Sequence, residues 1–276
     1  TMNRMNRMNQ MNRMNHMNHM NHMNQMNRIN RMLFATVAFA LSSATTADAD
    51  VLTVALDGTG DYTTIQAAID AAVTGDEVVL QPGIYNQTFN YLGKGLVVRS
   101  AEGPLTTRID RNGAGGTVVT ANGTPEGTRL EGIGFYVASG IMLDCDNANL
   151  VGDNLRFIGC SNEPFTIDGS STIALTRTQV VSCTSPARIG AGTVTMEDSA
   201  FRSGTSGGLR ITGGTVTMDR VDFQDCRGVN GAAIRIENGP TVVLRESALT
   251  SNDASNSGGS ISIVGAAVVD IIECQI

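Results

Sequence analysis

Residues 193–211 read TVTMEDSAFRSGTSGGLRI, and residues 215–236 follow the same pattern as TVTMDRVDFQDCRGVNGAAIRI. In both segments apolar residues alternate with polar ones in short runs, which predicts strands with one buried face. Equivalent positions such as Val194 and Val216 lie 22 residues apart. A repeat of this length predicts a solenoid in which each coil is one structural unit.

The same pattern continues over five coils. A bulky apolar position recurs every 21 to 26 residues, and the corners are rich in Gly, Asn, Asp and Ser. We therefore predict an all-β, right-handed parallel β-helix with three strands per coil of about 22 residues. An immunoglobulin-like sandwich would need hairpin turns instead of this fixed period. The bulky positions are Phe135, Phe157, Val180, Phe201, Phe223 and Leu249, and the apolar pairs that follow them are Phe165/Ile167, Ala187/Ile189, Leu209/Ile211, Ile234/Ile236 and Ile261/Ile263.

The stretch 51–85, VLTVALDGTGDYTTIQAAIDAAVTGDEVVLQPGIY, predicts a strand, a turn, a helix and a second strand. Asp61 or Thr63 can cap the helix, which we expect to run to about Val73. Residues 57–72 and 78–85 resemble the N-terminal region of pectin methylesterases and of many bacterial right-handed β-helix proteins of the pectate-lyase-like superfamily. That resemblance implies an N-terminal capping α-helix that covers the open edges of the first coil.

The coils also resemble the repeats of polymorphic outer-membrane proteins. Phe223-Gln-Asp-Cys226 and Leu249-Thr-Ser-Asn252 approximate their F-x-x-N element, and Gly207-Gly208-Leu209 approximates their paired-glycine element. This resemblance implies a stack exposed on a cell surface and involved in adhesion.

The N-terminal 49 residues differ in composition from the rest of the chain. Residues 1–31 form a Met-Asn-X low-complexity tract, and residues 26–49 have the layout of a signal peptide that ends in Ala47-Asp48-Ala49. We predict that residues 50–276 form the exported β-helix, secreted or held at the cell surface, with no transmembrane segment and as a monomer. Because Ile276 falls at a bulky position in mid-coil, we expect the C-terminal end of the stack to be incomplete.

Net charge and residue composition exclude several classes of partner and of catalytic chemistry. Residues 50–276 carry 14 Lys and Arg against 25 Asp and Glu, a net charge of −11, which argues against nucleic-acid partners. They contain no His, no Trp and one lysine, Lys94. Histidine-based acid–base catalysis and His-ligated zinc are therefore excluded for this segment, and a sugar-stacking platform is disfavoured.

No catalytic residues can be assigned. Motifs characteristic of pectin methylesterases and polygalacturonases are absent, so we expect no cofactor. A polysaccharide lyase remains the enzymatic alternative, favoured over a hydrolase or an esterase. Such an enzyme would use Ca²⁺ held by carboxylates. The candidate carboxylate groups, which are simpler to read as solvated corners, are Asp144/Asp146/Asp153 and Asp219/Asp222/Asp225.

Two columns of residues follow from the register. Asn154, Arg177, Asp198, Arg220 and Glu246 stand three residues before the bulky positions, which predicts a surface salt-bridge ladder. Cys160, Cys183, Gly204, Cys226 and Asn252 stand three residues after them, which predicts inward packing. Cys160 and Cys183 fall on adjacent coils, so a disulfide between them is conceivable.

The last two coils are longer on one flank. The extra residues fall in Arg227–Ala232 and Asp253–Gly259, and insertions in a solenoid often form the binding face. We therefore predict binding through Arg227, Asn230, Asp253 and Asn256, with a polysaccharide or another cell-surface component as the partner. The favoured function is a binding or structural module.

Overall fold

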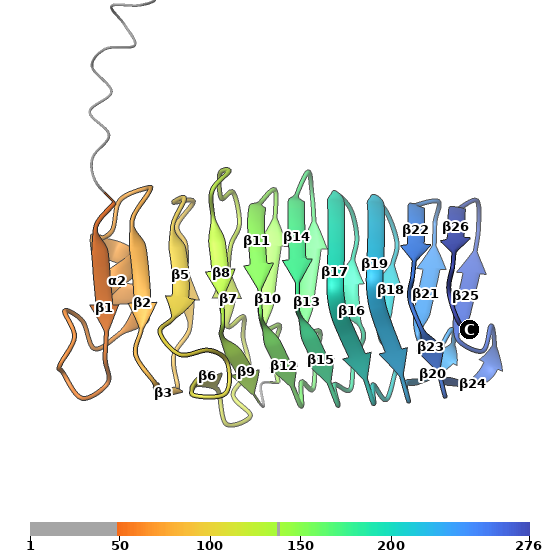
Figure 1. The fold of residues 1–276 in the computed structure, drawn as a ribbon, viewed down its shortest axis with the longest axis horizontal. Helices are drawn as coiled ribbons and strands as arrows, with labels where there is room; N and C mark the ends of the chain where they lie inside the picture. The colour runs from red at the N-terminus through yellow and green to blue at the C-terminus, as the bar shows by residue number, and fades with distance from the viewer. Residues whose placement is uncertain (1–48, 137–138) are drawn as a thin grey trace, which may run out of the picture. The chain divides into compact units, whose positions relative to one another are not determined.

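The computed structural model of the chain describes residues 49–136 and 139–276. These residues form a right-handed parallel β-helix of about 10 turns (Figure 1), which confirms the predicted fold. The low-complexity tract and, apart from Ala49, the signal peptide lie outside the described residues. No helix in the described part is long and apolar enough to cross a membrane.

Three ladders of parallel strands run along the stack, one for each strand of a coil. Ladder 1 contains β1 (Val51–Val54), β2 (Glu77–Leu80), β5 (Val97–Ser100), β8 (Arg129–Glu131), β11 (Asn149–Asp153), β14 (Thr172–Thr176), the first halves of β17 (Thr193–Arg202) and β19 (Thr215–Gln224), β22 (Thr241–Arg245) and β26 (Val268–Ile272). Ladder 2 contains β3 (Gly83–Tyr85), β6 (Thr107–Asp110), β9 (Gly134–Tyr136), β12 (Arg156–Ile158), β15 (Gln179–Val181), the second halves of β17 and β19, and β23 (Leu249–Thr250). Ladder 3 contains β4 (Phe89–Asn90), β7 (Val119–Thr120), β10 (Leu143–Asp146), β13 (Phe165–Asp168), β16 (Ala187–Ile189), β18 (Leu209–Ile211), β21 (Ile234–Glu237) and β25 (Ile261–Val264).

The predicted register is confirmed along ladder 2. Phe135 pairs with Phe157, and Phe201 pairs with Phe223, each on the next coil. Their rings stack with centroids 5.0 and 4.8 Å apart, respectively. These aromatic stacks are fully buried, and Val180 and Leu249 fill the equivalent buried position on other coils, so the repeat places a bulky apolar side chain at the same point of each.

The N-terminal cap is the short helix α2 (Ile65–Ala71), which buries Ile65, Ala68 and Ile69 against the first coil. The predicted cap was wrong: Thr64 is the N-cap residue, and its hydroxyl accepts a hydrogen bond from the amide of Ala67. The helix also ends before Val73, because Ala72 is already extended.

Lys94, the lone lysine of the predicted mature chain, closes the other end of α2. Its ammonium group donates to the carbonyl oxygens of Ile69, Asp70 and Ala72 at 2.8, 3.0 and 2.8 Å. A cation at a helix C-terminus satisfies carbonyl groups that the helix itself leaves unpaired. The ammonium group of Lys94 therefore has a structural role at the end of the capping helix.

The two longer segments of the last coils form regular structure. They contain β20 (Arg227–Asn230) and β24 (Asp253–Ser257), which pair in parallel as a separate two-stranded sheet. Stacking of one coil on the next brings the segments together, so they pair although neither shows apolar alternation. We call this pair sheet C.

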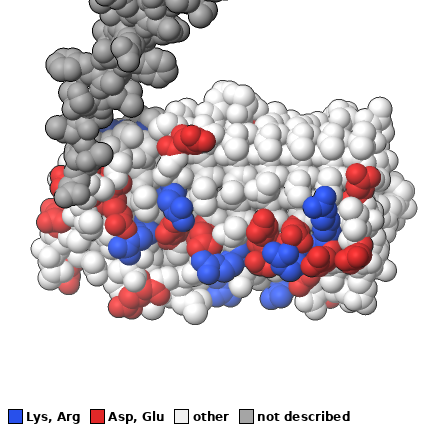
Figure 2. All heavy atoms as spheres, turned by 45° about the horizontal axis from the view of Figure 1, so that its top comes forward, with Lys and Arg blue, Asp and Glu red and all other residues white. Residues whose placement is uncertain are grey.

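Charged side chains are unevenly distributed over the surface. Figure 2 shows acidic and basic residues gathered in a band along the stack, beside regular rows of uncharged side chains. Part of the uncharged surface is ladder 1, where Thr193 and Thr195 pair with Thr215 and Thr217 on the next coil.

Candidate functional site

A surface hollow of about 430 Å³ lies between ladder 3 and sheet C. The residues that line it include three arginines and one carboxylate: Arg210, Arg227, Arg235 and Asp253. Small residues such as Gly207 and Ser255 complete its wall. We call this cavity the arginine hollow.

Two of the arginines come from a column of ladder 3. Arg188, Arg210 and Arg235 occupy equivalent outward positions on β16, β18 and β21, so they stack on successive coils at about 4.8 Å. The residues on either side of Arg210, Leu209 and Ile211, point into the core. Strand alternation therefore fixes the guanidinium groups on the outer face.

Glu237 forms hydrogen bonds with two of the three arginines of the hollow, Arg210 and Arg235. The Nε atoms of Arg210 and Arg235 donate to its two carboxylate oxygens at 2.8 and 3.0 Å. Burial opposes ionisation of Glu237, but the hydrogen bonds from Arg210 and Arg235 outweigh it and lower the pKa of the carboxyl group. One carboxylate thus orients two guanidinium groups while it offsets only one of their two positive charges.

Arg227 is the third arginine, and it stands at the start of β20. Its register partner on β24 is Asp253, and both residues line the hollow. Among the described residues, no carboxylate forms an ion pair with Arg227 within 4.0 Å. The guanidinium group is exposed and is available to a ligand.

The structure brings together three of the four predicted binding residues. Arg227, Asn230 and Asp253 line the hollow, whereas Asn256 does not. The side-chain amide of Asn256 donates to the side-chain oxygen of Asn230 at 2.8 Å, and the Ser257 hydroxyl does the same at 2.8 Å. Asn256 therefore ties β24 to β20 and supports the hollow from outside.

Arg210 and Arg235 are the residues that the sequence reasoning missed. Both stand between two inward apolar residues, in Leu209-Arg-Ile211 and Ile234-Arg-Ile236. The register that identified those apolar pairs also aligns the two arginines. Reading the outward positions of the same strands would have found them.

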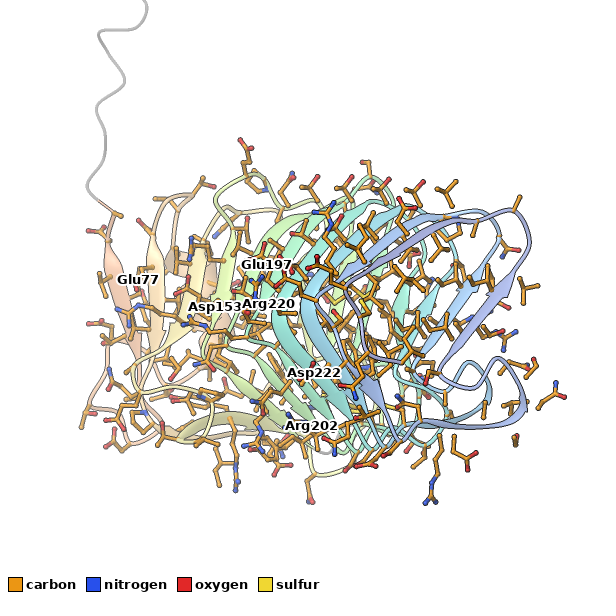
Figure 3. The ribbon with its side chains drawn as sticks, turned by 45° about the vertical axis from the view of Figure 1, so that its right-hand side comes forward. Glu77, Asp153, Glu197, Arg202, Arg220 and Asp222 are labelled. Carbon is orange, nitrogen blue, oxygen red and sulfur yellow. The ribbon has the colours of Figure 1, made fainter. Side chains whose placement is uncertain are left out.

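The predicted salt-bridge ladder is present only in part, at the corner between ladders 1 and 2. Within the described residues, Asp198 and Arg220 form the one ion pair between neighbours of the predicted column. Arg220 donates to Asp198 on the previous coil at 2.6 Å and to its neighbour Asp219 at 2.8 Å. Arg177 forms an ion pair with Asp153 on the previous coil. Figure 3 shows Asp153, Glu197 and Arg220 on one side of the stack, and Arg202 and Asp222 apart from them. We call Asp153, Arg177, Asp198, Asp219 and Arg220 the corner ladder.

The corner ladder has an unusual backbone. Arg177, Asp198 and Arg220 adopt φ angles of 50°, 48° and 54°, in the left-handed region that non-glycine residues seldom occupy. The tight corner imposes this conformation once per coil. The ion pairs join residues that the corner already holds in place, so this column is structural.

The carboxylate groups considered for Ca²⁺ do not converge. Asp144 and Asp146 lie on β10, but Asp153 lies on β11 and is bound to Arg177. Asp219 is paired with Arg220. Within the described residues, no three His, Cys, Asp or Glu side chains are grouped closely enough to hold a metal ion.

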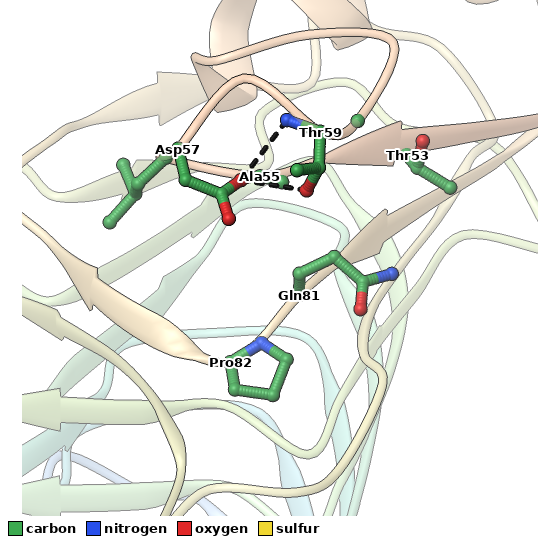
Figure 4. A pocket seen from close by; sticks show the side chains of 8 residues that line it. Thr53, Ala55, Asp57, Thr59, Gln81 and Pro82 are labelled. Carbon is green, nitrogen blue, oxygen red and sulfur yellow. Dashed lines mark hydrogen bonds between the residues drawn. The ribbon is translucent and has the colours of Figure 1, made fainter.

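A second hollow of about 450 Å³ lies beside the ends of β1 and β2 and the turn at residues 57–60 (Figure 4). Its charged residue is Asp57, whose carboxylate accepts hydrogen bonds from the Thr59 hydroxyl at 2.7 Å and from the Thr59 amide at 3.0 Å. These bonds lower the pKa of Asp57, the hydroxyl having the larger effect. The carboxylate therefore stays ionised but is held by its own turn, and the residues that line this hollow include no Lys or Arg.

Comparison with known proteins gives fold-level matches. No family model and no curated protein matches the chain. Among solved structures, it is similar to a pectin methylesterase from Aspergillus niger, with 13% identity and a TM-score of 0.40 over 84% of this chain and 86% of that chain. It is also similar to a pectin methylesterase from carrot, with 13% identity and a TM-score of 0.39 over 83% of this chain and 85% of that one.

The fold and the site together define an acidic parallel β-helix with an arginine-lined hollow on its longer flank.

Proposed function

We propose that this chain is an exported β-helix that binds a carbohydrate, and that the arginine hollow is its binding site. The observation that carries the proposal is the convergence of Arg210, Arg227 and Arg235 around one cavity. The cavity occurs where the coils are extended by sheet C. Extra chain at one flank of a solenoid typically serves a binding face.

The charge of the hollow favours an acidic glycan. Three guanidinium groups stand against the carboxylates of Asp253 and Glu237, which leaves one positive charge in excess in a segment whose net charge is −11. Guanidinium groups bind carboxylate and sulfate groups through paired N–H donors. Asp253 can accept hydrogen bonds from sugar hydroxyls, and the side-chain amide of Asn230 can donate to sugar oxygens. The ligand class we favour is therefore a polysaccharide with carboxylate or sulfate substituents.

The lining of the hollow also limits the mode of binding. The residues that form it include no aromatic side chain, so sugar rings would be held by hydrogen bonds and ion pairs. Such polar contacts with exposed arginines weaken as salt concentration rises. We therefore propose a salt-sensitive interaction of moderate affinity, without a stacking platform.

Location and partners follow the sequence-based expectations. The signal-like segment 26–49 supports export, and a polysaccharide or another cell-surface component is the proposed partner. We propose that the chain acts as a monomer, without a cofactor, and not as an enzyme.

A glycan array tests this proposal. The full chain is applied to acidic and neutral glycans alongside a variant in which 227–233 and 253–260 are each replaced by the Thr-Ser-Gly-Gly corner of 205–208. We expect binding to acidic glycans by the wild-type chain and none by the variant. Equal binding by both would refute the assignment of the site, and release of unsaturated sugars from a bound glycan would show a lyase instead.

A further inference from the structure

A column of small residues follows the strands of ladder 2, and it contains one pair of adjacent cysteines. The column consists of Cys160, Cys183, Gly204, Cys226 and Asn252. The amide of Thr184 donates to the carbonyl of Cys160 at 2.7 Å, which places Cys183 directly over Cys160 on the next coil. The same pattern continues from Thr205 to Cys183 and from Arg227 to Gly204. The column order predicted from the sequence is therefore confirmed.

The two thiols are buried in the core. Cys160 and Cys183 are 0% and 2% exposed and occupy equivalent positions on adjacent coils. Adjacent coils are about 4.8 Å apart, within the separation of about 4.4–6.8 Å that disulfide-bonded Cα atoms adopt. The Sγ atom of Cys160 also lies 3.3 Å from the Sδ atom of Met142, so the pair is enclosed by sulfur and apolar groups.

The other cysteines have no such neighbour in the column. Gly204 separates Cys183 from Cys226, which puts those two thiols two coils, or roughly 10 Å, apart. The residue above Cys226 is Asn252, whose side-chain oxygen accepts from the Cys226 amide at 3.0 Å. Cys145 lies on β10 in ladder 3.

We propose that Cys160 and Cys183 form a disulfide that links adjacent coils when the chain folds under oxidising conditions. One thiolate attacks a small disulfide such as oxidised glutathione and releases one glutathione thiolate. The second cysteine then attacks the mixed disulfide and releases the other. Two cysteines are oxidised, one glutathione disulfide is reduced to two glutathione molecules, and the two cysteine protons pass to those products.

The timing of the reaction follows from burial. Cys160 and Cys183 are both buried, so an external oxidant has little access to either thiol in the folded protein. The bond therefore forms while the coils assemble and only slowly afterwards. This inference concerns the scaffold and is independent of the proposed carbohydrate site.

Peptide mapping tests the bond, because the five cysteines fall in five different tryptic peptides. Cleavage after Arg156, Arg177 and Arg188 gives peptides 157–177 and 178–188, with one member of the pair in each. The full chain is refolded with oxidised glutathione, alkylated under denaturing conditions and digested without reduction. We expect these two peptides to remain linked, two hydrogen atoms lighter than their sum, and the other three cysteines to be alkylated.

Two variants and one comparison complete the test. Cys226→Ala removes a buried thiol of the same column and should leave the link intact, whereas Cys183→Ala should leave Cys160 alkylated. Closing a loop of this length should raise the thermal midpoint of the oxidised protein over the reduced one by about 6–12 °C, in wild type and Cys226→Ala but not in Cys183→Ala. Recovery of 157–177 and 178–188 as separate alkylated peptides after oxidative refolding would overturn the proposal, as would oxidation of the folded protein as fast as during refolding.

Discussion

The corner ladder and the arginine hollow are both stacks of charged residues, but they differ in how the charges are matched. At the corner, Arg220 meets carboxylates on its own coil and on the coil before it. In the hollow, Arg210 and Arg235 stack directly and share Glu237, while Arg227 stands opposite Asp253 without an ion pair within 4.0 Å in the described structure.

The difference shows how one solenoid register can serve two purposes. Where opposite charges meet at the corner, Arg177 and Arg220 are both paired with carboxylates and no unpaired guanidinium group is left for a ligand. Where like charges repeat and the flank is extended, a surplus of guanidinium groups remains beside a cavity. Substitutions of charged residues in the arginine hollow should therefore weaken ligand binding, whereas substitutions in the corner ladder should leave ligand binding unchanged.

The largest expected effect comes from removing sheet C. Replacing 227–233 and 253–260 by the shorter corner of 205–208 deletes Arg227 and Asp253 and opens the hollow on one side. We expect affinity for an acidic oligosaccharide to fall at least about 100-fold, because several charge-assisted hydrogen bonds are lost together. Titration calorimetry measures the affinity, and circular dichroism checks that the variant keeps its β-structure.

A smaller effect is expected from single arginines. Arg227→Ala removes the outermost guanidinium group and should weaken binding of the same oligosaccharide about tenfold or more. Arg220→Ala, in the corner ladder, is the matched control and should bind as the wild type does. If both substitutions weaken binding equally, the distinction between the two regions is wrong.

The decrease in thermal stability at acidic pH should depend in part on Glu237. Its pKa is lowered in the folded protein, so it contributes stability above the ordinary pKa of a glutamate, and that contribution is lost as pH falls through the lowered value. We expect Glu237→Gln to unfold at a lower temperature than wild type at pH 7, with the gap narrowing at pH 3. Thermal melts at the two pH values measure it, and a constant gap would contradict the role of the Arg210–Glu237–Arg235 cluster.

The smallest effect is expected in the corner ladder itself. Arg220 is exposed, and exposed ion pairs contribute little because water and salt screen them. Arg220→Ala should shift the thermal midpoint less than Glu237→Gln does, and the shift should shrink further in high salt. A large, salt-independent loss of stability would show that the ladder holds the corner conformation.

The sequence predicts the scaffold well, because apolar residues at period two within a period near 22 leave few alternatives to a β-helix. The register of Phe135, Phe157, Phe201 and Phe223 is observed as predicted. Local choices are harder, because Asp61, Thr63 and Thr64 can all cap a helix. In the structure Thr64 is the cap, and the Asp61 carboxylate instead accepts hydrogen bonds from the amide and hydroxyl of Thr53.

The candidate site could be predicted only in part. Arg227, Asn230 and Asp253 could be located because the coil becomes longer there. Sheet C could not, because Arg227–Asn230 has no apolar alternation and pairs with β24 only through stacking of the coils. The shared carboxylate of Glu237 follows from the three-dimensional approach of two arginines from neighbouring coils.

The most direct test of the account is hydrogen exchange of the full chain with and without a saturating uronic-acid oligosaccharide. We predict that amides of β20, β21 and β24, which surround the arginine hollow, exchange more slowly when the oligosaccharide is bound. Amides of the corner ladder at Asp198 and Arg220 should exchange at unchanged rates. Protection at the corner ladder or at the N-terminal cap, with none at sheet C, would contradict the arginine hollow as the binding site.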